Sequence, residues 1–273
     1  MNLQTVSTWR RDLAAMRERF PLVTHKFGGG EWQVRDTSSV SGIERPALVL
    51  LPGSLGSADI FFKQVLSFGT DFRCLAIDYP SISTDALADD LAALIDRLQL
   101  QRTCVLGSSL AGYWLQWFGA THPSHVACIV LSSAFIDSST LDTNPLFDRE
   151  ALTSQDGAQT KVEWMTRLAA RDPDELVEIQ MDLLAHTQSG DSLQARLLHA
   201  ATATPAPIID ASLPVALIDC ADDPLIDQRT RRELALRYPD ALRLSLGTGG
   251  HYPHVVQSDV FTAFVRSILS TLG

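Results

Sequence analysis

The 273-residue chain is long enough for one large α/β domain with a sizeable buried core. Its 22 basic and 32 acidic residues give a net charge of −10, which argues against nucleic acid and an anionic membrane surface as partners, because both need a basic face. With 45% hydrophobic and 20% charged residues, the composition is that of a soluble enzyme rather than a disordered chain.

Neither a membrane span nor a secretion signal is predicted, because the chain has no run of about 18 apolar residues and its N-terminus lacks an apolar signal segment. Four cysteines lie within or beside apolar runs, as buried free thiols do in a reducing compartment: Cys74, Cys104, Cys128 and Cys220. No CxxC motif and no Cys/His cluster has metal-ligand spacing. We therefore expect a cytoplasmic protein without a metal or a cofactor.

Strand and helix patterns alternate along the first half of the chain. After an N-terminal arm or helix, residues 1–19, the predicted strands are 22–27, 31–36, 47–51, 73–77, 103–106 and 126–131. Glycines 28–30 predict a hairpin turn between the first two strands. The predicted helices are 57–68, 84–98 and a third ending near residue 121; Thr84 is the expected N-cap of the second.

The alternation stops over residues 135–207, where only helical stretches are predicted, at 159–170 and 173–186. It resumes with a strand at 215–218, a helix at 227–237, a strand at 241–245 and one final helix from 253 to 272. Repeated βα units predict a mainly parallel sheet of about eight strands with helices on both faces. The expected domains are a core, residues 20–134 and 208–273, and a helical lid, residues 135–207, over the carboxyl ends of the strands.

Ser109 is the candidate nucleophile. It lies between an apolar strand and an aromatic-rich amphipathic helix, in the stretch Gly107-Ser108-Ser109-Leu110-Ala111-Gly112. A nucleophile elbow turns so sharply that residues two positions away on either side must be small, as Gly107 and Ala111 are. The aromatic residues after the elbow are predicted to pack in the core rather than to stack on a substrate.

A base and an acid follow in the chain order that the elbow requires, serine, acid, histidine. Asp223 follows the strand at 215–218, and His251 follows the strand at 241–245, so both lie just past the carboxyl end of a strand. A serine hydroxyl needs an imidazole to take its proton, and the imidazole needs a carboxylate to orient it. The alternatives are that Asp222 and Asp223 form a solvated turn, that His251 caps the final helix, and that His254 is the base.

An oxyanion hole needs two backbone N–H groups. One should come from Leu110, directly after the nucleophile, and the other from the Gly-containing loop after the strand at 47–51. Ser54 is the first candidate there and Leu55 the next.

The whole chain from about residue 20 resembles the α/β-hydrolase-fold superfamily, and in detail the maspardin-like proteins. The matching stretches are LPGSLGSADIFFKQVL, AIDYP, LQLQRTCVLGSSLAGYWLQ, VLSSAFIDSS and RYPDALRLSLGTGGHYPHVVQS. The resemblance implies the α/β-hydrolase fold, with the nucleophile at Ser109, the acid at Asp223 and the base at His251. Maspardin-like proteins are regarded as non-catalytic binding proteins and have an asparagine where this chain has His251, so the resemblance also implies a non-catalytic binding function as an alternative.

The leading expectation is thus a serine hydrolase of the carboxylic ester hydrolase class that cleaves an ester, thioester or lactone of a small molecule. One alternative is a non-catalytic binding or scaffold protein, with a protein partner or as a homodimer. The other is a hydrolase-fold receptor that turns over slowly.

Overall fold

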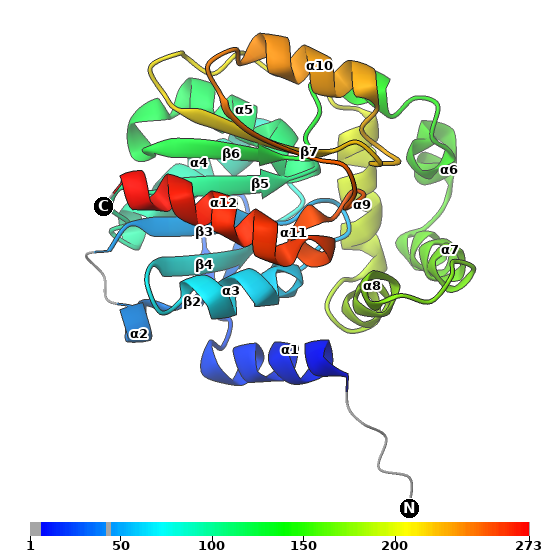
Figure 1. Cartoon of the computed structure of the whole chain (residues 1–273). Coiled ribbons are helices and arrows are strands. Elements are labelled where there is room, and N and C mark those ends of the chain that lie inside the picture. The colour runs from blue at the N-terminus through cyan, green and yellow to red at the C-terminus, as the bar shows by residue number, and fades with distance from the viewer. Residues whose placement is uncertain (1–6, 42–44, 273) are drawn as a thin grey trace, which may run out of the picture.

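An eight-stranded sheet in the order β1-β2-β4-β3-β5-β6-β7-β8 forms the centre of the computed structural model, which describes residues 7–41 and 45–272 (Figure 1). The strands β1 and β2 pair antiparallel to each other and β2 to β4, whereas β3 to β8 run parallel. The mainly parallel sheet and the hairpin predicted from the sequence are therefore confirmed. The strands are β1 (Val23–Lys26), β2 (Glu31–Asp36), β3 (Ala47–Leu51), β4 (Arg73–Asp78), β5 (Cys104–Ser108), β6 (Cys128–Ser132), β7 (Val215–Cys220) and β8 (Leu242–Leu246).

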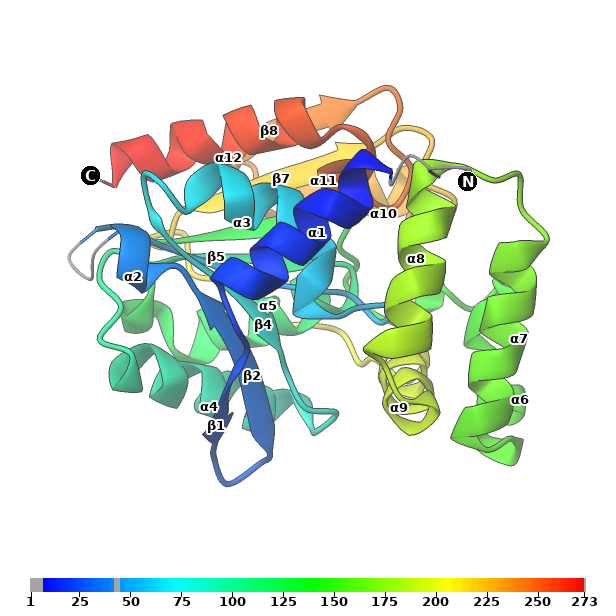
Figure 2. The same ribbon diagram turned by 90° about the horizontal axis from the view of Figure 1, so that it is seen from below.

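Helices cover both faces of the sheet (Figure 2). The central strands β3, β5 and β6 are buried at every position, because successive side chains point to opposite faces and helices cover both faces. In β3, Val49 and Leu51 pack with one set of helices, α4 (Thr84–Arg97), α5 (Leu110–Thr121) and α10 (Gln228–Arg237). Leu48 and Leu50 pack with the other set, α1 (Thr8–Arg19), α3 (Phe62–Phe68) and α12 (Ser258–Thr271).

Four helices lie between β6 and β7, together at the end of the sheet towards which β5 points (Figure 1). They are α6 (Arg149–Ser154), α7 (Gly157–Ala169), α8 (Glu175–His186) and α9 (Gly190–Ala201). Each begins after a residue whose side chain accepts a first-turn N–H group: Asp148, Asp156, Asp174 and Ser189. We call the predicted segment 135–207, which contains them, the insertion.

Two sequence predictions about helix ends are wrong. The N-cap of α4 is Ser83, whose Oγ accepts from the N–H of Ala86, while the Thr84 hydroxyl lies 2.9 Å from Nε2 of His199 in the insertion. The predicted final helix is two helices, α11 (Pro253–Val256) and α12, because the chain leaves helical geometry at Gln257. Gln64 donates to the His254 carbonyl at 2.8 Å, which takes an acceptor that a continuous helix would use.

The four cysteines are buried and free, as the sequence predicts. The N-terminal arm forms α1 over residues 8–19, whereas residues 1–6 of that prediction lie outside the described residues. The short α2 (Ser38–Ser41) follows β2. Within residues 7–41 and 45–272, no helix combines the length and apolar character needed to cross a membrane.

Candidate active site

Ser109 occupies a strained turn between β5 and α5. Its φ of 54° and ψ of −116° fall where non-glycine residues are rare, which is the backbone form of a nucleophile elbow. The N–H of Ser109 donates to the Ser132 carbonyl at 2.9 Å and so fixes the turn to the end of β6. A side chain at Gly107 would place its Cβ 2.6 Å from the Ala111 backbone, which explains why the elbow has glycine there.

His251 and Asp223 form a buried pair. The Nδ1 atom of His251 lies 3.0 Å and 2.9 Å from the two carboxylate oxygens of Asp223, and the two residues are 6% and 8% exposed. Burial alone would raise the pKa of Asp223, but the facing His251 and the N–H groups of Leu225 and Ile226 outweigh it, so the pKa lies below its ordinary value. Asp223 is therefore an anion at neutral pH, and Nε2 is the free nitrogen of His251.

The neighbouring carboxylate, Asp222, holds the backbone of the histidine loop. Its two oxygens accept from the N–H groups of Gly249 at 3.2 Å and Gly250 at 2.8 Å. Both glycines have a positive φ, 143° and 56°, which lets the chain turn between β8 and His251. The two adjacent aspartates thus have separate tasks, and the sequence prediction of a single acid missed the second.

His254, the alternative base, packs among aromatic rings and forms no hydrogen bond with a carboxylate within the described part of the chain. It is 1% exposed, and its ring lies 4.7 Å from the Phe61 ring and close to Tyr252 and Phe261. Neither ring nitrogen has a hydrogen-bond partner among the described residues. Burial, with the charges of His251 and Lys63, lowers the pKa of His254 to about 3.

The loop after β3 borders the nucleophile. A Cβ on Gly53 would lie 2.9 Å from the Cβ and 3.5 Å from the Oγ of Ser109, so only glycine permits this approach. Leu110 is the first residue of α5, and first-turn N–H groups have no acceptor within their own helix. Ser54 and Leu55 follow Gly53 directly, so the three candidate oxyanion donors come from two segments that meet at Ser109.

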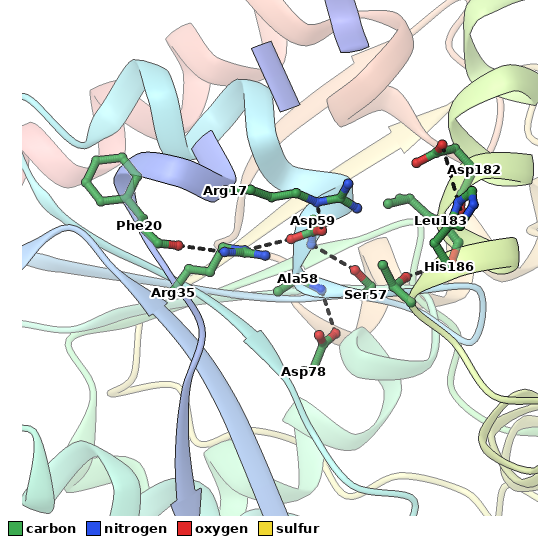
Figure 3. Close-up of polar contacts among 11 residues, drawn as sticks. Arg17, Phe20, Arg35, Ser57, Ala58, Asp59, Asp78, Asp182, Leu183 and His186 are labelled. Carbon is green, nitrogen blue, oxygen red and sulfur yellow. Dashed lines mark hydrogen bonds and ion pairs between the residues drawn. The ribbon is translucent and has the colours of Figure 1, made fainter. Parts of the chain in front are cut away.

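The end of β4 and the residue that follows it hold the loop after β3 in place through hydrogen bonds. The Tyr79 hydroxyl donates to the Pro52 carbonyl at 2.8 Å, and Asp78 accepts from the N–H of Ala58 at 2.6 Å (Figure 3). Burial raises the pKa of Asp78 to about 6, although Arg196 and the Ala58 N–H oppose this. Figure 3 also shows Asp59 between two arginines, Arg17 at 2.6 Å and Arg35 at 2.7 Å, which join the loop to α1 and β2.

The insertion also reaches the loop. Arg196 of α9 donates from Nη1 to the Gly53 carbonyl at 3.2 Å and the Gly56 carbonyl at 3.1 Å, and from Nη2 to the Tyr79 carbonyl at 2.6 Å. Gln188, between α8 and α9, donates from Nε2 to the Ser54 carbonyl at 2.8 Å. Through these contacts, side chains of the insertion hold the backbone carbonyls of the loop after β3.

A model of the alpha/beta hydrolase family matches residues 48–264. The chain belongs to this family. Among its relatives, maspardin of Mus musculus is 28% identical over 236 residues, which cover 81% of this chain and 74% of that protein.

Solved structures of two other proteins share the architecture of this chain. A hydrolase from Pseudomonas aeruginosa superposes with a TM-score of 0.74 at 20% identity, over 91% of this chain and 98% of that one. The enol-lactonase from Burkholderia xenovorans superposes with a TM-score of 0.67 at 17% identity, over 91% of this chain and 100% of that one. At these identities the likeness shows the fold alone.

Arg196 and Gln188 were missed by sequence reasoning in this alpha/beta hydrolase. One signal was present for Arg196, since it stands among buried apolar residues of α9, Leu193, Leu197 and Ala200, at helical spacing. An arginine on an apolar face needs buried acceptors. The sequence does not say that those acceptors are the carbonyls of a loop some 140 residues earlier, as the pairing of Arg196 with Gly56 shows.

Proposed function

We propose that this alpha/beta hydrolase is a serine hydrolase that cleaves an ester, thioester or lactone of a small molecule through an acyl-enzyme. The observation that carries the proposal is the buried contact between His251 and Asp223. The strained turn at Ser109 follows a strand parallel to those that precede these two residues, so all three lie at the same edge of the sheet. An imidazole with one nitrogen on a carboxylate is the base that a serine nucleophile needs.

In the acylation step, the Oγ atom of Ser109 attacks the substrate carbonyl carbon while Nε2 of His251 takes the hydroxyl proton. Asp223 holds the Nδ1–H of His251 and stabilises the imidazolium that forms. The negative charge on the carbonyl oxygen is taken by the N–H groups of Leu110 and of Ser54 or Leu55. His251 then gives its proton to the leaving alkoxide, thiolate or lactone oxygen, and the acyl group stays on Ser109.

In the deacylation step, water attacks the acyl carbon and gives one proton to His251. The tetrahedral intermediate collapses, the bond to Oγ breaks, and His251 returns the proton to Ser109. The insertion acts as a lid that shapes the acyl and alcohol sites over the strand ends. Phe147, Trp164 and Met181 of the insertion pack in or against the hydrophobic core that also contains Leu110 and Ala111 of the elbow, and these apolar surroundings favour an apolar substrate.

The similarity to maspardin favours one other candidate function, a binding protein that uses the same fold without turnover. The two functions differ in what they require of Ser109. A hydrolase needs its hydroxyl as a nucleophile, whereas a binding protein needs only the shape of the site. A test at Ser109 therefore separates them.

The test is labelling by a fluorophosphonate probe combined with hydrolysis of short p-nitrophenyl esters. We expect the wild type to be labelled at Ser109 and to turn over, and Ser109→Ala to lose both, with kcat lower by about 10³-fold or more. The small loss of volume at a half-buried position leaves the fold intact, which circular dichroism checks. A wild type that is not labelled and hydrolyses esters no faster than Ser109→Ala would establish the binding function instead.

A further inference from the structure

Each candidate oxyanion donor of the loop after β3 belongs to a peptide group whose carbonyl is bound by the insertion. The N–H of Ser54 and the carbonyl of Gly53 are one peptide group, and Arg196 donates to that carbonyl. The N–H of Leu55 and the carbonyl of Ser54 are the next peptide group, and Gln188 donates to that one. Because a trans peptide is planar, its C=O and N–H point in opposite directions, so fixing the carbonyl fixes the direction of the N–H.

We infer that Arg196 is a positioning residue for the oxyanion hole: from α9 it sets the direction of the Ser54 N–H beside Ser109. The inference rests on the proposed function, because an oxyanion hole has a task only where an oxyanion forms. Gly53 lies against Ser109, so the peptide that Arg196 orients borders the nucleophile. A donor must be in place before the charge develops, since preorganisation is what makes it effective.

The charge of Arg196 adds to its geometric effect. Arg196 is 3% exposed, and among the described residues no carboxylate oxygen lies within 4.0 Å of its nitrogens, although its charge lowers the pKa of the nearby Asp78. Its guanidinium faces three carbonyl oxygens and lies 4.1 Å from the centre of the Tyr79 ring. A hydrogen bond from a cation polarises the amide that accepts it, which makes the N–H of the same peptide a stronger donor.

Buried charge is costly, and apolar packing alone could join α9 to the core. The fork of the guanidinium, however, reaches the carbonyls of Gly53 and Gly56 with one nitrogen and that of Tyr79 with the other. It thereby spans the loop and the end of β4 at once. Docking of the insertion and assembly of the oxyanion hole are therefore a single event in this molecule, and a displaced α9 leaves the Ser54 peptide free to rotate.

The experiment compares Arg196→Met and Arg196→Lys with the wild type and with Arg167→Met, a control at an exposed arginine of α7. With p-nitrophenyl esters we expect kcat to fall roughly 10- to 100-fold in Arg196→Met while KM stays within about threefold. Arg196→Lys keeps the charge but not the fork, so its loss should be smaller, and the control should match the wild type. The thermal unfolding midpoint of each variant is measured first, and all assays are run below the lowest of these midpoints.

A small alkylboronic acid provides a readout that a merely structural role would not move. Its tetrahedral adduct with Ser109 places an oxygen in the oxyanion hole, so its Ki should rise in Arg196→Met by the same factor by which kcat falls. A folded Arg196→Met with wild-type kcat, or one in which KM rises and the boronate Ki does not, would overturn the inference. If Arg196→Met does not fold, Arg196→Lys decides by the same criteria.

A crystal structure of Arg196→Met, or of Arg196→Lys in its place, tests the positioning without turnover. We expect the Gly53–Ser54 peptide to be rotated or to lose its single orientation, with the His251–Asp223 contact unchanged. An unaltered peptide would refute the positioning role. The proposed function fails separately, through a wild type that is neither labelled nor active, and the crystal structure still answers the question about Arg196 in that case.

Discussion

The carboxyl edge of the sheet and the insertion contribute to the same candidate site in different ways. At the sheet edge, Ser109, Asp223 and His251 each follow the strand that carries them by a few residues, and their reactive side chains do the proposed chemistry. In the insertion, Arg196 and Gln188 use side chains to hold backbone groups that belong to another segment. In the proposed function the first kind of residue supplies reacting atoms and the second supplies their geometry, so substitutions in the two regions should differ in the size of their effect and in the kinetic constant that changes.

The largest loss of activity is expected at Asp223, on the side of the proposed reacting residues. Replacing Asp223 with Asn removes the negative charge that holds the Nδ1–H of His251, so the imidazole is no longer oriented or stabilised as a cation. We expect kcat for ester hydrolysis to fall by about 10⁴-fold, measured on protein whose far-ultraviolet circular dichroism matches that of the wild type.

The matched control is Asp222→Asn, one residue away in the same loop. The hydrogen bonds that Asp222 accepts in the structure come from two backbone N–H groups rather than from the His251 ring, and an asparagine oxygen can retain one of those bonds. Its loss should be about tenfold or less, because only the placement of the histidine loop is loosened. Equal losses in the two variants would show that Asp223 acts on loop structure rather than on His251.

An intermediate effect is expected in the insertion at Gln188. Gln188→Met keeps the length of the side chain but removes the hydrogen bond to the Ser54 carbonyl, and with it the constraint on the Leu55 N–H. If Ser54 is the main donor, kcat should fall about threefold to tenfold, less than in Arg196→Met, with KM nearly unchanged. A larger loss in Gln188→Met than in Arg196→Met would assign the oxyanion donor to Leu55.

The difference between the two regions also explains what could be predicted from the sequence. Strands buried on both faces give apolar runs, and a parallel sheet brings the residues after those runs to one edge, so Ser109, Asp223 and His251 could be predicted as candidates from local patterns. The roles of Asp222 and Asp223 could not be distinguished from the sequence pattern, because the partners of Asp222 are the backbone N–H groups of Gly249 and Gly250, and every residue except proline has such a group. Arg196 poses the same problem over a longer distance, since its acceptors are carbonyls and leave no trace in the sequence.

Capping residues and helix breaks depend on contacts of the same kind. Thr84 was predicted as a cap because threonine suits that position, but the serine before it can do the same, and His199 offers Thr84 another partner. The interruption between α11 and α12 follows from a side chain on α3, Gln64, that takes the His254 carbonyl. Contacts with residues distant in the sequence are thus the common reason for the differences between prediction and structure.

His254 offers the smallest effect on activity and the clearest effect on stability. Its pKa of about 3 in the folded protein lies below the value of about 6.5 in an unfolded chain, so between these pH values only the unfolded state gains the proton. The contribution of His254 to stability is therefore complete above about pH 6.5 and is lost as the pH falls, at about 1.4 kcal/mol per pH unit. Asp78, with its pKa raised to about 6, has the opposite sign: it adds stability as the pH falls from about 6 to 4, so the wild-type curve alone is ambiguous.

The comparison of wild type with His254→Leu removes that ambiguity, because Asp78 titrates in both proteins and cancels in the difference. We expect the difference in unfolding free energy, wild type minus variant, to rise with pH by about 1.4 kcal/mol per unit between about pH 4.5 and 6, as measured by urea denaturation. Ester hydrolysis above pH 7 should change by less than about twofold, because His254 contacts aromatic rings rather than Asp223. Stability curves that run parallel with pH would show that His254 is already protonated in the folded protein over this pH range. A loss of activity as large as that of Asp223→Asn would show that His254, rather than His251, is the base, and the distinction between reacting and supporting residues within that loop would no longer hold.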